Sequence, residues 1–370
     1  MAPKSDGGTA VAEAAPNEGP STETVDQTRP YSPSWADRLT DLVDRLPGPS
    51  WLYYAGIALI LALIQAATLW IEGIQPSDRF IVNHGTLTVI GVLFFALVHY
   101  LDSEARRALS AWRPAIAPTV GDEQYEELEF RLATLPALPT LLVCLAVVTG
   151  AVLTNLFTAP PETLREVTSS PAATTVTYAM YLLTWWVVAT FVYHTIHQLQ
   201  TINLIYTDHT QINVYRTSPL YALSRVTALT AASLTIPTYA WFAINPGLLA
   251  DPIAIAIIVI ITALALVVFV LPMMGVHRLL VEEKARMQNE AALRFEAIVG
   301  ELHQRIDSGN LEVMDALNDA ISSLKVERDA LKAAPTWPWP PETVRLLITA
   351  LALPLGLWLI QFLVQRAFGP

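Results

Sequence analysis

Five of the seven histidines fall at one end of long apolar segments, where an imidazole could take part in chemistry: His99, His194, His197, His209 and His277. His194 and His197 are three residues apart, so their rings share one face of a helix. Two imidazoles on one face could belong to a metal or haem ligand set. Alternatively, they cap helices at the level of the lipid headgroups. Because no cysteine pair and no carboxylate stands beside them, we predict no cofactor and keep His194 and His197 only as a candidate metal site.

A second constellation is the row of hydroxyls formed by Thr227, Thr230 and Ser233, interleaved with Ala231 and Ala232. Hydroxyls on one helix face could line a water-filled pore or a subunit contact. Alternatively, small residues let two helices approach closely, and the hydroxyls bond to their own backbone. The apolar segments contain no acidic residue, which disfavours ion-coupled transport and an aspartyl protease within the membrane. We therefore predict that the protein is not an enzyme.

The composition identifies the elements that must hold these residues. Of 370 residues, 53% are hydrophobic and only 15% are charged, against about 25% charged in soluble domains. Seven apolar runs are long enough to span a bilayer, at about 51–71, 80–101, 136–158, 174–197, 220–243, 252–275 and 346–364. The net charge of −11 and the single cysteine exclude a nucleic-acid binder and a disulfide scaffold. The fold class is thus an all-α, seven-helix transmembrane bundle whose first partner is the lipid bilayer.

The rest of the chain divides around these spans. Residues 1–33 are predicted to be a disordered tail, and 34–47 an amphipathic helix at the membrane surface. Spans one to six occupy 48–275, with a hinge at Pro272 and Gly275. Residues 276–334 have two apolar stripes at helical spacing, interrupted at Gly309, which predicts an antiparallel, coiled-coil-like hairpin. Residues 335–370 form a proline strap, with Trp337 and Trp339 as interface anchors, and the seventh span.

The distribution of Lys and Arg predicts the orientation. With the N-terminus inside, only Arg79, Arg165 and Arg366 lie outside, as the preference for basic residues on the cytoplasmic side requires. We predict a plasma-membrane protein with a cytoplasmic N-terminus, an extracytoplasmic C-terminus and a cytoplasmic hairpin. The stripes of this hairpin need each other or a partner, so 277–334 is also the predicted binding site for a cytoplasmic protein.

Two resemblances bear on function. The hairpin and strap resemble stretches of uncharacterised prokaryotic membrane proteins. The topology resembles the seven-transmembrane ion channels that include insect odorant and gustatory receptors. In the last helix of that family, Thr-Tyr precedes five apolar residues and Gln-Phe; here Gly356–Ile360 precede Gln361-Phe362, but Pro354-Leu355 replace Thr-Tyr.

This resemblance implies a homo-oligomer with Gln361 and Phe362 at a subunit contact or near a pore. We therefore expect an oligomeric channel-like or receptor-like protein gated through its hairpin. The alternatives are a non-catalytic scaffold or sensor that binds a cytoplasmic partner, and a small-molecule transporter.

Overall fold

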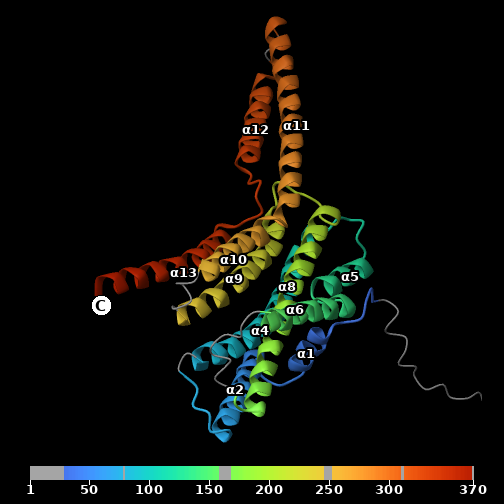
Figure 1. The fold of residues 1–370 in the computed structure, drawn as a ribbon. Coiled ribbons are helices and arrows are strands. Elements are labelled where there is room, and N and C mark those ends of the chain that lie inside the picture. Colours follow the sequence, from blue (N-terminus) through green and yellow to red (C-terminus); the bar gives the residue numbers. More distant parts are fainter. Residues whose placement is uncertain (1–28, 78–79, 158–167, 246–251, 310–311, 369–370) are drawn as a thin grey trace, which may run out of the picture.

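The computed structural model describes residues 29–77, 80–157, 168–245, 252–309 and 312–368, and Figure 1 shows their arrangement. Within these ranges the chain is helical and contains two isolated β-bridges but no strand, which confirms the predicted all-α class. The α-helices are α1 (Trp35–Asp44), α2 (Ser50–Ile71), α4 (Thr86–Trp112), α5 (Asp122–Leu132), α6 (Ala137–Phe157), α8 (Pro171–Asp208), α9 (Tyr221–Ile244), α10 (Pro252–Val270), α11 (Met273–Asp307), α12 (Met314–Ala333) and α13 (Pro341–Phe368).

Five stretches of the described chain are long and apolar enough to cross a membrane: Ser50–Ile71, Thr86–Ala115, Ala137–Thr154, Pro171–Asp208 and Ile258–Asp307. They coincide with the first four predicted spans and with the sixth. The fifth and seventh predicted spans form the helices α9 and α13, which are not among the five. Many α13 side chains lie outside the described residues. The structure therefore supports a multi-pass membrane protein.

The helices α4 and α8 form the centre of the bundle, because each packs against the other and against further helices. Their contact is close: a Cβ atom built on Gly91 of α4 would lie 2.9 Å from Thr184 Oγ1 of α8. The helices α9, α10 and α13 lie side by side on one flank (Figure 1). Two buried apolar clusters join these groups, one around Phe94 and Phe191 and the other around Trp112 and Tyr206.

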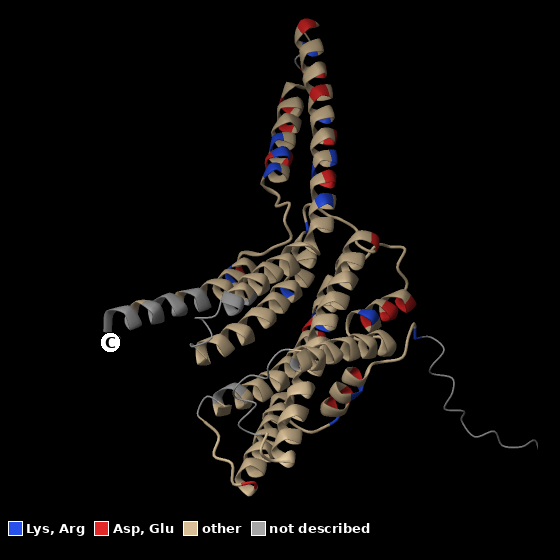
Figure 2. Ribbon diagram, in the orientation of Figure 1, with Lys and Arg blue, Asp and Glu red and all other residues tan. Residues whose placement is uncertain are grey.

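The helices α11 and α12 project from the bundle side by side, and Figure 2 shows that their surfaces carry much of the charge of the molecule. The Lys284 ammonium of α11 donates to the carbonyls of Lys332 and Ala334, at 2.9 and 2.7 Å, where α12 ends. Ala291 and Leu331 are buried between the two helices, together with Val214 from the loop after α8. The loop after α8 therefore packs against both α11 and α12 at these residues.

The last residues of the predicted tail are packed against the bundle. Residues 29–33, which the sequence assigns to the predicted tail, contact the segment that links α5 to α6; the rest of that tail, 1–28, lies outside the described residues. Pro33 forms a β-bridge with Pro136, and the Ser34 amide donates to Leu135 O at 3.0 Å. Arg29 stacks over the ring of Phe130 at 5.6 Å. These contacts offset the entropic cost of ordering residues 29–33. The polar composition of the segment does not reveal them.

The helix α1 buries an unexpected face. Its capping box pairs Ser34 with Asp37, and Asp37 and Thr40 are turned inward while Leu39 and Leu42 are exposed. The exposed leucines are available to lipid, as a surface helix requires. The inward side of α1 is therefore partly polar, and Asp37 on it accepts from the Leu135 amide of the α5–α6 link and interacts with the charge of Asp102 of α4.

Candidate functional site

The most unusual feature of the interior is an imidazole–carboxylate pair between α4 and α8. His194 Nε2 lies 2.7 Å from Asp102 Oδ1, and the two side chains are only 3% and 6% exposed. A buried ionisable pair is expensive unless each charge is compensated, and it is most common where protons, ions or substrates are bound. His194 Nδ1 is also buried and has no partner.

His197 connects this pair to the N-terminal segment. Its Nε2 lies 3.0 Å from the Arg131 carbonyl oxygen and 3.2 Å from the Tyr31 hydroxyl. The same hydroxyl donates to Thr134 O at 2.8 Å. His194 and His197 share one face of α8, as predicted from their spacing, so the buried pair is one helical turn from a half-buried tyrosine near the surface.

A second histidine pair lies one turn earlier on α4. His99 Nε2 lies 2.8 Å from Asp44 Oδ1 of α1, and His99 Nδ1 lies 2.8 Å from the Tyr54 hydroxyl of α2. Both ring nitrogens therefore have protein partners. His99 and Asp102 are one turn apart on α4, so the two pairs form one group, which we call the histidine–aspartate cluster: Asp37, Asp44, Tyr54, His99, Asp102, His194 and His197.

Asp37 brings a further carboxylate to this cluster. Its oxygens accept hydrogen bonds from the Ser34 amide at 2.8 Å, the Ser34 hydroxyl at 2.7 Å and the Leu135 amide at 3.1 Å. Burial raises the pKa of Asp37 to about 6 despite these donors, and the charge of Asp102 adds to the increase. Asp37 is thus poised to change charge in the mildly acidic range.

Within the described ranges, no three His, Cys, Asp or Glu side chains are placed to hold a metal ion. His194 and His197 both use Nε2 in hydrogen bonds within the protein, and these bonds go to different partners. The two rings can hold and pass protons, because the His194 ring is bonded to Asp102 and the His197 ring to the Arg131 carbonyl and the Tyr31 hydroxyl.

The predicted hydroxyl row on α9 is buried. The Thr227 hydroxyl donates to Ser224 O and the Thr230 hydroxyl to Val226 O, each at 2.8 Å, and Ser233 is also buried. Both threonine hydroxyls therefore donate to carbonyls of their own helix. Gln361 and Phe362 lie on α13, but their side chains are outside the described residues.

The strap and the predicted hinge form the joint between the bundle and the helix pair. His277 stacks on Trp337 with a centroid distance of 3.8 Å, Trp337 stacks on Trp339 at 4.4 Å, and Trp339 stacks on Phe269 at 4.8 Å. His277 Nδ1 also lies 2.8 Å from Thr336 O. The two tryptophans that the sequence predicts as interface anchors therefore also pack against the protein.

Pro272 and Gly275 have different roles at this joint. The helical path breaks between Val270 and Met273, and Pro272 is the N-cap residue of α11. Gly275, by contrast, lies within α11 at a close contact with α8, where an added Cβ would lie 3.0 Å from Thr207 Cγ2. The proline thus stands at a change between helices, whereas the glycine permits close packing.

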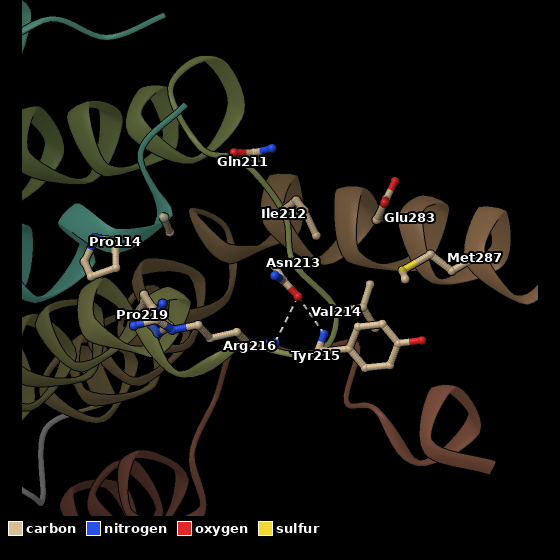
Figure 3. A pocket seen from close by; sticks show the side chains of 11 residues that line it. Pro114, Gln211, Ile212, Asn213, Val214, Tyr215, Arg216, Pro219, Glu283 and Met287 are labelled. Carbon is tan, nitrogen blue, oxygen red and sulfur yellow. Dashed lines mark hydrogen bonds between the residues drawn. The ribbon is translucent and has the colours of Figure 1, made fainter. Parts of the chain in front are cut away.

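A groove of about 330 Å³ lies beside this joint, between the 211–216 loop, Pro114, Pro219 and the first turns of α11 (Figure 3). The Asn213 carboxamide oxygen accepts from the amides of Tyr215 and Arg216, at 3.0 and 3.2 Å, and shapes the loop. The Tyr215 hydroxyl reaches Glu327 of α12 at 3.3 Å. The loop after α8 therefore touches both projecting helices.

No family model, no curated protein and no solved structure matches this chain. The functional argument therefore rests on the geometry described above.

Sequence reasoning named His194 and His197 but missed their partners. Asp102 follows the end of the second predicted span directly, so it was counted with the water-exposed segment, and His99 and Asp37 were not assigned to a site. One signal could have found them: His99 and Asp102 have the same three-residue spacing as His194 and His197. Two helices with paired polar residues near the same end are candidates for packing together.

Proposed function

We propose that this protein is an oligomeric, channel-like or receptor-like membrane protein whose projecting helix pair transmits force or binding to the bundle. The observation that supports this best is the connection at the base of the pair. Only Leu271 and Pro272 separate α10 from α11, and α12 leads through the Trp337–Trp339 strap to α13. The stacked rings from Phe269 to His277 join both connections. A displacement of the pair would therefore act on α10 and α13 together.

The proposal includes seven spans, with α9 and α13 added to the five apolar stretches. The N-terminus and the α11–α12 hairpin would be cytoplasmic, and the C-terminus extracytoplasmic, in the plasma membrane. The distribution of charge supports this, since α1, α5, α11 and α12 carry much of it (Figure 2). Cysteines placed at Gln75 and Ser308 of a Cys144→Ala chain test the topology. Gln75 should react with an impermeant thiol reagent on intact cells, and Ser308 only after permeabilisation.

An oligomer is supported by the position of α13. This helix packs mainly on α9 at the edge of the molecule (Figure 1), and Leu346, Ile348 and Leu363 are exposed on it. Apolar faces at the edge of a bundle are available to lipid or to a second copy. A tetramer with α13 at its centre would place Gln361 and Phe362 near the shared axis.

Purified protein in planar bilayers tests the proposal. We expect a tetramer in detergent and unitary currents, both altered when Gln361 is replaced by Leu. A monomer that gives no current under a transmembrane voltage would overturn it. Thr230→Val is the matched control, because the Thr230 hydroxyl already bonds to its own helix and its loss should leave conductance unchanged.

A second candidate function is a non-catalytic scaffold or sensor. It is favoured by apolar side chains that the helix pair leaves exposed, including Leu293, Ile306 and Val326. Such residues can bind a soluble protein without any permeation. A silent monomer that binds one cytoplasmic protein, with loss of binding on Leu293→Glu and Val326→Glu, would establish this function.

A further inference from the structure

The interior of α2, α4 and α8 is polar at two levels. Toward one end, Gln65 of α2, Thr88 of α4 and Thr177 of α8 are buried, at 6%, 5% and 1% exposed. Toward the other end is the histidine–aspartate cluster. Thr88 precedes Asp102 by 14 residues on the same helix, which is about 20 Å along the axis. Polar groups at both levels of a predicted membrane bundle require a physical explanation.

The two levels are aligned by the packing of the helices. α4 and α8 run in the same direction, since Gly91 meets Thr184 and, further along, Asp102 meets His194. α2 runs the opposite way: Tyr54 bonds to His99, and Gln65 lies 11 residues on. Thr88 likewise precedes His99 by 11 residues on α4. Because the two helices are antiparallel and paired at Tyr54 and His99, Gln65 and Thr88 lie at the same level along the bundle axis.

Some of these buried polar atoms have no partner in the protein. Gln65 Nε2 and Thr177 Oγ1 are unpartnered at the first level, as are His194 Nδ1 and Gln198 Oε1 at the second. A buried polar atom without a partner is costly, and ordered water is the usual way to satisfy it. Each level therefore has the donors and acceptors for a small group of water molecules.

An aromatic layer separates the two levels. Phe94 of α4 and Phe191 of α8 are buried and lie with ring centroids 4.8 Å apart. Phe95 and Tyr54 add a second pair of rings at 5.9 Å. Apolar constrictions of this kind interrupt water and can act as gates.

We propose that α2, α4 and α8 form a proton path, with the His194–Asp102 pair as the group that is protonated in transit. A proton arriving from the level of Gln65 and Thr177 would cross the Phe94–Phe191 layer by transient wetting and bind to this pair. It would leave through water at the unpartnered His194 Nδ1 to His197, one turn further along α8, and then to Tyr31, whose hydroxyl lies 3.2 Å from His197 Nε2. Each step moves one proton between oxygen and nitrogen lone pairs, and the path needs no other reactant.

Charged and titratable groups face this pair from every neighbouring element. Asp37 of α1, Tyr54 of α2 and His197 of α8 all interact with the charge of Asp102, and Arg131 of α5 interacts with His197. On α4 itself, Glu104 pairs with Arg107 and with Arg225 of α9, at 2.7 and 3.6 Å.

Proton flux into vesicles tests this path separately from ion currents and from the helix pair. Full-length protein is placed in phosphatidylcholine vesicles that contain a pH-sensitive dye, and a potassium gradient with valinomycin provides the driving voltage. We expect proton entry well above that of protein-free vesicles. Asp102→Asn and His194→Gln should each reduce entry to the protein-free level, while His303→Gln on the exposed part of α11 should not. Proton entry equal to that of empty vesicles would overturn the proposal even if unitary currents of other ions were present.

Two further variants keep the test decisive if the polar substitutions disturb folding. Phe191→Ala shortens the aromatic layer and should increase proton entry, whereas Phe80→Ala, a buried ring away from this layer, should not. The infrared difference spectrum between the wild type and Asp102→Asn should show a carboxylic-acid band that belongs to Asp102, whereas the Asp37 band should be present in both. Unchanged flux in Phe191→Ala, together with no such band, would show that the cluster only holds the helices together.

Discussion

Gly275 of α11 lies so close to Thr207 of α8 that a Cβ atom would stand 3.0 Å from Thr207 Cγ2 and 3.3 Å from Asn203 Oδ1. The base of the projecting pair is therefore held against the bundle by backbone proximity. Replacing Gly275 by Ala should lower the thermal unfolding temperature in detergent, because the β-branched Thr207 has little room to move. Overpacking of this kind costs about 1–3 kcal/mol.

Gly300 provides the matched control on the same helix. Nothing lies within 4 Å of its hypothetical Cβ, so Gly300→Ala should stabilise α11 by up to about 1 kcal/mol through helix propensity. Equal shifts in both variants would show that α8 does not constrain Gly275.

The Gly91–Thr184 contact makes a parallel prediction at the centre of the bundle. A Cβ on Gly91 would lie 2.9 Å from Thr184 Oγ1 and 3.3 Å from the Thr184 Cα atom. Because a backbone atom cannot turn aside, Gly91→Ala should separate α4 from α8 and destabilise the protein by about 1–3 kcal/mol. Differential scanning of the purified protein would measure this. Gly150→Ala on α6, which meets nothing within 4 Å, should be neutral or stabilising.

Asp37 should make the docking of the N-terminal segment dependent on pH. Burial raises the pKa of its carboxyl to about 6 from the ordinary 3.8, so the folded state favours the neutral acid. The stabilisation is fully present below the ordinary pKa and is lost as the pH rises through 6. About 1.4 kcal/mol per unit gives at most about 3 kcal/mol between pH 4 and pH 7.

The difference between the wild type and Asp37→Asn isolates this contribution. The wild type should lose protection of residues 29–37 from protease as the pH rises from 4 to 7, whereas the neutral amide should give a nearly flat profile. Asp41→Asn, on the exposed side of α1, should behave as the wild type. If the protease protection of the wild type does not change with pH, the Asp37 carboxyl is exposed to water and the prediction is wrong.

The sequence predicted the apolar helices well and the polar interior poorly, for one physical reason. Hydropathy is local, so each apolar run is visible without knowledge of its neighbours. The partner of His194, however, is 92 residues away, and nothing near Asp102 distinguishes a buried carboxylate from a solvated one. Likewise, Asp37 and Thr40 are buried on the inward side of α1. The Asp37 carboxylate is accommodated there because the Leu135 amide donates to it, a contact between residues 98 positions apart. Close contacts such as Gly275 on Thr207 also depend on tertiary packing, so the sequence alone does not reveal them.

The ring stack at the base of the helix pair can be tested by removing its central member. Trp337 lies between His277, at 3.8 Å, and Trp339, at 4.4 Å, and each aromatic pair contributes about 0.5–1.5 kcal/mol beyond its buried area. Trp337→Ala should therefore loosen α11 and α12 relative to the bundle without unfolding either. Spin labels at Ser323 of α12 and Glu126 of α5, in a Cys144→Ala chain, should give a broader distance distribution in the variant. Trp70→Ala is the control, since that ring is 82% exposed at the end of α2 and should leave the distribution unchanged. If the two variants give the same narrow distribution, the stack does not hold the joint, and transmission from the helix pair must depend on the Lys284 and Gly275 contacts instead.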